Sequence, residues 1–295
     1  MIVVYYALTF LCNLLCRFSV KRYSSNADNF FNLLLYSGLT GIFAIIFFLF
    51  SSGFQLSFNG RTCVYAFVYS LIVMVSLSIS LVILRYIGIS ESGIITSTGT
   101  LILTSLTGFL FFREAVTLAS VLRIILMLLA TFSIFLSGKK KQSSQTKISV
   151  TGLLLCLGSI LVGVGNSLIN KLFATDPLVT DSNSFFFLTN VFLVAIVLLV
   201  ILVTSKGNLV QCIRELKGIS GGQYLMILLN TVSSNISSLL SILILAQVSV
   251  SLHAPLSSAI GILTNGILAL WVFQEKPKLL PILLSLFAVI LGAFQ

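Results

Sequence analysis

The chain has 295 residues, of which 58% are hydrophobic and 8% are charged, and its mean hydropathy is +1.14. This composition is typical of a protein whose main solvent is lipid, and it excludes an ordinary soluble domain. The formal net charge of +10 comes from basic residues that lie mainly in short loops, which indicates membrane orientation and no nucleic-acid partner.

Apolar runs long enough to cross a bilayer core of about 30 Å recur along the whole sequence. They predict ten transmembrane helices near residues 2–20, 31–50, 63–84, 93–112, 116–136, 150–170, 185–204, 222–245, 253–273 and 278–294. No basic residue precedes the first run, so we expect a retained helix and no signal peptide. The fold class expected is therefore an all-α, multi-pass membrane protein.

A polar segment divides the ten predicted helices into two units of five. Residues 138–149 contain a lysine cluster and a Ser/Gln-rich stretch, and we expect them to link a first unit at 1–137 to a second at 150–295. Because five is an odd number, the second unit must enter the membrane inverted relative to the first. An even total also places both termini on the same side.

The two units repeat polar positions at a constant offset of 161 residues, which is the separation of Glu114 and Glu275. The offset pairs Ser97 with Ser258, Thr104 with Asn265, Ser76 with Ser237 and Ser80 with Ser241. A duplicated bundle with polar residues inside its apolar spans is typical of secondary transporters.

Two segments, 84–114 and 245–275, also resemble a known family. Each ends on a glutamate just before the next predicted helix, and the second contains Ala254-Pro255 near the start of span nine. With the five-plus-five plan, these features resemble the EamA-type transporters of the drug/metabolite transporter superfamily over essentially the whole chain. Arg123 and Leu284 depart from the pattern, because the family usually carries small residues there.

The orientation in the membrane has two readings. Odd-numbered loops carry thirteen lysines and arginines and even-numbered loops carry three, which places the odd loops in the cytoplasm and both termini outside. The family resemblance implies that both termini are cytoplasmic. Both readings stay open, and the membrane we expect is the plasma (inner) membrane of a prokaryote.

Neutral hydrogen-bonding residues follow single faces of the predicted spans, and each needs a partner because an unsatisfied polar group in hydrocarbon costs several kcal/mol. They either pack helices together or line a central cavity that binds a substrate. His253, at the mouth of span nine, is either part of this cavity or a hydrogen-bonded bystander. The cavity candidates are Thr9, Asn13, Tyr69, Ser76, Ser97, Thr100, Thr104, Asn166, Asn170, Asn230, Ser234, Ser237, His253, Ser258 and Asn265.

Few charged residues lie within or beside the spans. Glu114 and Glu275 begin the following helices, where a carboxylate gains roughly 0.3 to 1 kcal/mol from free backbone amides; the alternative role is proton coupling. Arg17 and Lys171 close spans one and six in equivalent places, and Arg123 lies well inside span five. Arg17 and Lys171 either extend to lipid headgroups or attract an anionic substrate.

These features predict a secondary-active transporter that moves a small polar or amphipathic metabolite, such as an amino acid, by alternating access through a central cavity. The alternatives are an exchanger of anionic phosphorylated metabolites and a non-transporting membrane scaffold or lipid-handling protein. We expect no enzyme, because no nucleophile, base and orienting group can be placed together. We also expect no cofactor and no metal, and a monomer or homodimer whose partners are a small-molecule solute and membrane lipids.

Overall fold

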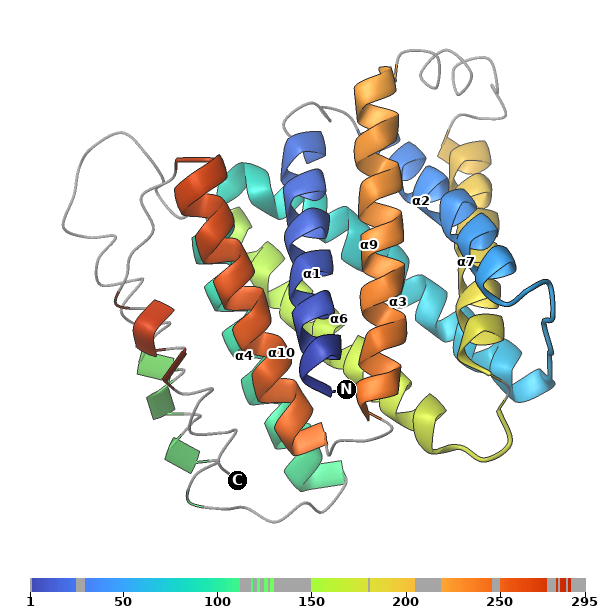
Figure 1. The fold of residues 1–295 in the computed structure, drawn as a ribbon. Helices are drawn as coiled ribbons and strands as arrows, with labels where there is room; N and C mark the ends of the chain where they lie inside the picture. The colour runs from blue at the N-terminus through green and yellow to red at the C-terminus, as the bar shows by residue number, and fades with distance from the viewer. Residues whose placement is uncertain are drawn as a thin grey trace.

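The computed structural model is helical throughout its regular elements and contains no strand among the residues that it describes (Figure 1). Those residues are 2–24, 30–111, 150–179, 181–204, 219–245 and 250–274, with separate positions between 118 and 129 and between 280 and 287. The elements are α1 (Ile2–Ser24), α2 (Phe30–Ser51), α3 (Gly60–Tyr86), α4 (Ile89–Phe111), α6 (Val150–Thr175), α7 (Ser182–Thr204), α9 (Gly221–Leu245), α10 (Val250–Ile267) and the π-helical turn η1 (Leu268–Val272).

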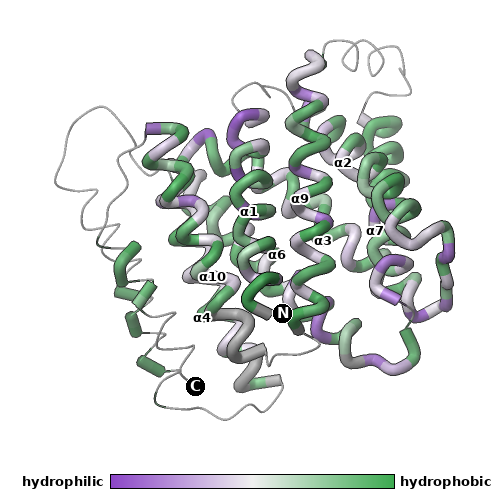
Figure 2. Tube along the Cα trace, viewed as in Figure 1, coloured by the Kyte–Doolittle hydropathy of each residue, from purple (hydrophilic) through white to green (hydrophobic). Residues whose placement is uncertain are grey.

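Six of these helices, α1, α2, α3, α6, α7 and α9, are long and apolar enough to cross a membrane. A shorter apolar helix covers Leu256–Val272. Figure 2 shows that hydrophobic residues run along the helices while hydrophilic residues gather near helix ends and in the connecting segments. The prediction of an all-α protein with transmembrane helices is therefore confirmed. Most of predicted spans five and ten lies outside the described residues.

Short polar motifs set several helix boundaries. Asn59 precedes α3 and caps it, since its side-chain oxygen accepts the backbone N–H of Thr62 at 2.7 Å. Asp181 precedes α7 and accepts the N–H of Ser184 at 3.1 Å in the same way. At the other end of the chain, α10 passes into η1, where Phe273 N–H reaches back to the carbonyl of Leu268 at 3.0 Å.

Helices α2 and α7 pack along their length in opposite directions. The rings of Phe48, near the end of α2, and Phe186, near the start of α7, stack with centroids 5.4 Å apart. A β-carbon added at Gly38, in the middle of α2, would lie 3.3 Å from Val197, later in α7. Later residues of one helix therefore meet earlier residues of the other, and the pair is antiparallel.

Helices α4 and α10 form a second antiparallel pair. A β-carbon added at Gly93 would overlap the side-chain amide of Asn265, and one added at Gly261 would lie 3.2 Å from the hydroxyl of Ser97. Each glycine allows the backbone of its helix to approach the neighbouring helix closely. Contacts between α1 and α9 and between α3 and α6 join the remaining long helices (Figure 1).

Two buried clusters occupy opposite ends of the bundle. The ion-pair end, defined by residues 51–61 and 176–184, lies over a cluster of mainly aromatic side chains that includes Phe48, Phe173 and Phe185. The lysine end, defined by Lys21, Leu84 and Phe273, lies over a larger and mainly aliphatic cluster in which Tyr23 and Tyr36 have centroids 4.6 Å apart.

Candidate functional site

Asn166 and Asn170 lie on the face of α6 that is turned away from its exposed apolar side. Residues nine positions apart in an α-helix are separated by two and a half turns and lie on opposite faces. Asn166 follows exposed Leu157 by nine positions, and Asn170 follows exposed Leu161 by nine. Because the exposed leucines mark the lipid-facing side, both asparagines face the interior of the bundle.

The polar face of α1 is turned inward in the same way. Asn13 lies nine positions after exposed Val4, and Arg17 lies nine positions after exposed Leu8. Thr9 shares this face and is buried. An arginine on the inward side of an apolar helix is costly unless its charge is compensated.

Helices α3 and α9 repeat this arrangement. Exposed Phe67 precedes Ser76 by nine positions, and exposed Leu228 precedes Ser237 by nine. The inward faces also carry buried Tyr69 and Asn230 and partly buried Ser234. The predicted polar stripes of four helices therefore point toward the centre.

The polar stripe of α4 lies against glycines of its neighbours. Ser97 faces Gly261 of α10, and a β-carbon added at Gly163 of α6 would lie 2.8 Å from the Thr100 hydroxyl. Ser258 lies one turn before Gly261 on the same face of α10. These contacts are those of closely packed helices, which favours the packing interpretation for Ser97 and Thr100.

Side-chain hydrogen bonds join the inward faces of the two halves of the chain. Asn13 Nδ2 donates to Ser237 Oγ at 3.4 Å, and Cys16 Sγ donates to Asn230 Oδ1 at 3.0 Å. Cys16 was not among the predicted cavity residues, although it lies three positions after Asn13 on the same stripe. Helical spacing places this thiol on the inward stripe, but its bond to Asn230 could not be predicted from spacing, because the two residues are 214 positions apart.

The hydroxyls of Thr9 and Ser234, by contrast, bond back to carbonyls of their own helices, those of Tyr5 and Thr231. Such local bonds satisfy a hydroxyl without any neighbour. The amides therefore carry more of the bonding between helices than these hydroxyls do.

Several buried polar atoms have no hydrogen-bond partner among the described residues, and five of these atoms lie on four of the predicted cavity residues. They are Thr104 Oγ1, Asn166 Oδ1, Asn170 Oδ1 and both amide atoms of Asn265. An unsatisfied buried polar group costs about 1 to 3 kcal/mol, so each calls for a water or a ligand. Asn265, at 1% exposure, is the most enclosed of them.

Five other predicted residues lie near helix ends or outside the described part of the structure. Lys171 is partly buried near the end of α6, directly after Asn170. Position 253 lies in α10, but the side chain of His253 is outside the described part of the structure. Glu114, Arg123 and Glu275 also lie outside the described residues.

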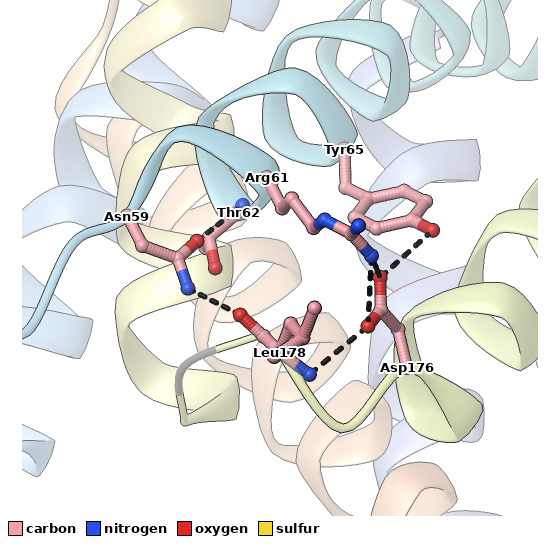
Figure 3. A network of polar contacts seen from close by, with 6 residues as sticks. All are labelled: Asn59, Arg61, Thr62, Tyr65, Asp176 and Leu178. Atoms are coloured by element: carbon pink, nitrogen blue, oxygen red, sulfur yellow. Dashed lines mark hydrogen bonds and ion pairs between the residues drawn. The ribbon is translucent and has the colours of Figure 1, made fainter.

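A polar network that we did not predict from the sequence closes the ion-pair end (Figure 3). The guanidinium of Arg61, at the start of α3, lies 3.2 Å from the carboxylate of Asp176, just after α6. The hydroxyl of Tyr65 donates to the same carboxylate at 3.4 Å, and Asn59 donates to the carbonyl of Leu178. The network thus joins the α2–α3 loop to the α6–α7 loop.

The carboxylate of Asp176 is held in its charged form by this network. The backbone N–H of Leu178, which donates to it at 3.0 Å, is the main cause that lowers the pKa of Asp176 below its ordinary value of 3.8. Arg61 and the Tyr65 hydroxyl lower the pKa further. Asp176 therefore stays ionised at any physiological pH.

Further bonds extend the contact between the same two loops. The backbone N–H of Ser57 donates to Ser184 Oγ at 2.9 Å, and the Ser57 hydroxyl donates to the Asp181 carboxylate at 3.2 Å. Beneath them, the rings of Phe173 and Phe185 stack with centroids 4.2 Å apart. A polar layer therefore covers an aromatic layer at this end.

The lysine end has a different construction. Lys21 Nζ donates to the carbonyl of Leu84 at 3.4 Å and lies 5.9 Å from the centroid of the Phe273 ring. The rings of Phe18 and Phe273 stack at 6.3 Å. One cation, an aromatic ring and a helix carbonyl thus bring the ends of α1, α3 and η1 together.

The sequence matches no protein-family model and no curated protein. The fold, however, is similar to that of a solved protein crystal structure with a TM-score of 0.59 and 16% sequence identity. The likeness covers 98% of this chain and 96% of the other. At this identity the similarity concerns the fold alone.

Proposed function

We propose that the protein is a secondary-active transporter that moves a small polar or amphipathic metabolite by alternating access through a central cavity. One observation carries the proposal: α1, α3, α6 and α9 all turn polar faces, which consist mainly of neutral residues, inward and opposite their exposed apolar sides. Burying polar groups among apolar helices is costly, and solute pathways are a common reason for it.

The antiparallel packing supports two inverted five-helix repeats. In the repeat inferred from the sequence, α2 corresponds to α7 and α4 to α10, and both pairs are antiparallel. The contacts between helices follow the same repeat. Helix α1 packs against α9 and α10, and its equivalent in the second unit, α6, packs against α3 and α4, which are the equivalents of α9 and α10. A carrier of this plan rocks one unit against the other around a site near the midplane. The EamA-type resemblance of the sequence is in agreement with this plan.

The chemistry of the inward faces favours an amino-acid-like solute. Asn13, Asn166, Asn170 and Asn230 offer amides, and the other inward groups are mainly hydroxyls. Amides present both donors and acceptors, which suits a solute that carries both kinds of group. No phosphate-sized cluster of cations lies among the described inward residues.

Flux into proteoliposomes tests the proposal directly. We expect the purified protein to move amino acids or related metabolites, and we expect Asn13→Leu and Ser237→Ala to reduce flux because they remove a bond between α1 and α9. Ser37→Ala is the matched control, since its hydroxyl bonds only to the carbonyl of Leu33 within α2. A protein that moves no solute above the lipid background would contradict transport and favour a membrane scaffold or lipid-handling role.

The inward position of Arg17 favours a second candidate, an exchanger of anionic phosphorylated metabolites. A guanidinium binds carboxylate and phosphate groups in a bidentate manner. This version predicts that Arg17→Gln abolishes exchange of phosphorylated solutes while expression is intact, and that Arg17→Lys restores part of it. Normal amino-acid flux in Arg17→Gln would decide against the exchanger.

A further inference from the structure

The inward face of α6 presents two hydrogen-bond acceptors to which no described residue donates. Asn166 Oδ1 and Asn170 Oδ1 are both buried and have no partner among the described residues. They lie four positions apart on one helix face, which separates them by about one turn of 5.4 Å. Two open acceptors so close together can bind one group that carries several donors.

The two asparagines lie in the seam between α3 and α4. On one side, a β-carbon added at Gly165 would lie 3.3 Å from Ile72 of α3. On the other side, Gly163 meets Thr100 of α4. Because both neighbours approach α6 through glycines, the acceptors between these contacts are directed toward the centre of the bundle and away from lipid.

The other unit has no corresponding pair of acceptors. If Arg17 and Lys171 are equivalent, the positions equivalent to Asn166 and Asn170 are Cys12 and Cys16. Cys16 donates to Asn230 Oδ1 and thereby satisfies the acceptor on that side. Two open acceptors about one turn apart thus occur in α6 and not at the equivalent positions of α1, so a solute bound between the units has a reason to adopt one orientation.

We propose that Asn166 and Asn170 bind the amino group of the transported solute, an inference that rests on the transport function proposed above. An ammonium group has three donors and no acceptor, which complements two carbonyl oxygens; a carboxylate or phosphate has only acceptors and does not. Neutral carbonyls compensate a buried full charge only in part. The ammonium group is therefore that of a zwitterion such as an amino acid.

Matched pairs of L-amino acids and the corresponding 2-hydroxy acids test this subsite, because the two differ only in the amino group. We expect the amino acid, and not its hydroxy acid, to raise the thermal stability of the purified protein and to be moved into proteoliposomes. Asn166→Leu and Asn170→Leu should each lower the apparent affinity for the amino acid at least tenfold. Asn170→Asp keeps the acceptor and adds charge, so it should retain amino-acid binding.

Ser167→Ala is the control, since the Ser167 hydroxyl bonds back to the carbonyl of Gly163 at 3.1 Å. Its affinity should equal that of the wild type. Two results would overturn the subsite: equal binding of amino and hydroxy acids, or unchanged amino-acid affinity in both leucine variants. Either result would mean that only water occupies the acceptors, and the proposed transport function would still stand. A wild type that moves no solute of any kind would instead overturn the proposed function, and the subsite with it.

Discussion

The two ends of the bundle are closed by different kinds of interaction. At the ion-pair end, loops from the two halves of the chain are joined by polar contacts, chief among them the pair between Arg61 and Asp176. At the lysine end, a large buried apolar cluster joins the helices, and Lys21 adds a carbonyl contact and a cation–π contact. When polar contacts near water are broken, water replaces the lost partners, so the cost in free energy is small. Separating an apolar cluster costs more, because it exposes apolar surface to water.

This difference bears on how an alternating-access carrier would open. The side chain of Arg61 is 60% exposed, and exposed ion pairs contribute only about 0 to 1 kcal/mol. Breaking the polar layer at the ion-pair end is therefore inexpensive, and the aromatic layer beneath it supplies most of the closure. The lysine end lacks such a separable polar layer among the described residues. We expect the ion-pair end to be the one that opens from the conformation described here.

A covalent link across the ion-pair end should have the largest effect. In a Cys63→Ser background, the pair Asn59→Cys and Leu178→Cys replaces the contact between the two loops with a disulfide. We expect flux to fall to the lipid background under oxidising conditions and to recover when a reductant is added. Each single cysteine variant serves as a control. Full flux through the cross-linked protein would show that this end need not separate.

Removal of a ring from the aromatic layer should have the next largest effect. Phe48 is 0% exposed, so Phe48→Ala should lower the free energy of unfolding by about 3 to 5 kcal/mol. Phe50→Ala, in the same helix, is the matched control, because Phe50 is 67% exposed and should change little. Thermal unfolding in detergent measures both variants. If both variants lost the same amount of stability, the buried packing of Phe48 would not be what stabilises the aromatic layer.

One glycine at each end of the bundle has a different environment. A β-carbon at Gly93, near the lysine end, would overlap the amide of Asn265, whereas one at Gly60, at the ion-pair end, would meet nothing within 4 Å. Gly93→Ala should therefore destabilise the protein by about 1 to 3 kcal/mol. Gly60→Ala should be close to neutral. The same thermal assay compares them, and a neutral Gly93→Ala would mean that Asn265 moves freely.

The smallest expected effect is a change in acid sensitivity at the ion-pair end. Because the network lowers the pKa of Asp176 in the folded protein, its stabilising contribution is complete above about pH 4 and is lost as the pH falls through the lowered pKa. Asp176→Asn should therefore be less stable at neutral pH and lose less stability on acidification. Thermal unfolding between neutral and acidic pH checks the difference in slope. Identical pH profiles would contradict a role for Asp176.

Local patterns in the sequence determined the helices and their polar faces. The apolar run predicted at 222–245 corresponds to α9 at Gly221–Leu245, and the run at 150–170 corresponds to α6, which continues to Thr175. Run length and helical periodicity are properties of neighbouring residues, so they could be read without a structure. The inward direction of Asn166 and Asn230 follows from the same periodicity.

Only the tertiary structure decided which polar groups meet. Arg61 and Asp176 are 115 positions apart, and Cys16 and Asn230 are 214 apart, so no local pattern relates them. Their contacts depend on the depth and rotation at which whole helices pack, which arise from the sum of many small side-chain contacts. For the same reason, the sequence could show that Ser97 lies on a polar stripe, but not that the stripe meets Gly261 in a tight helix contact.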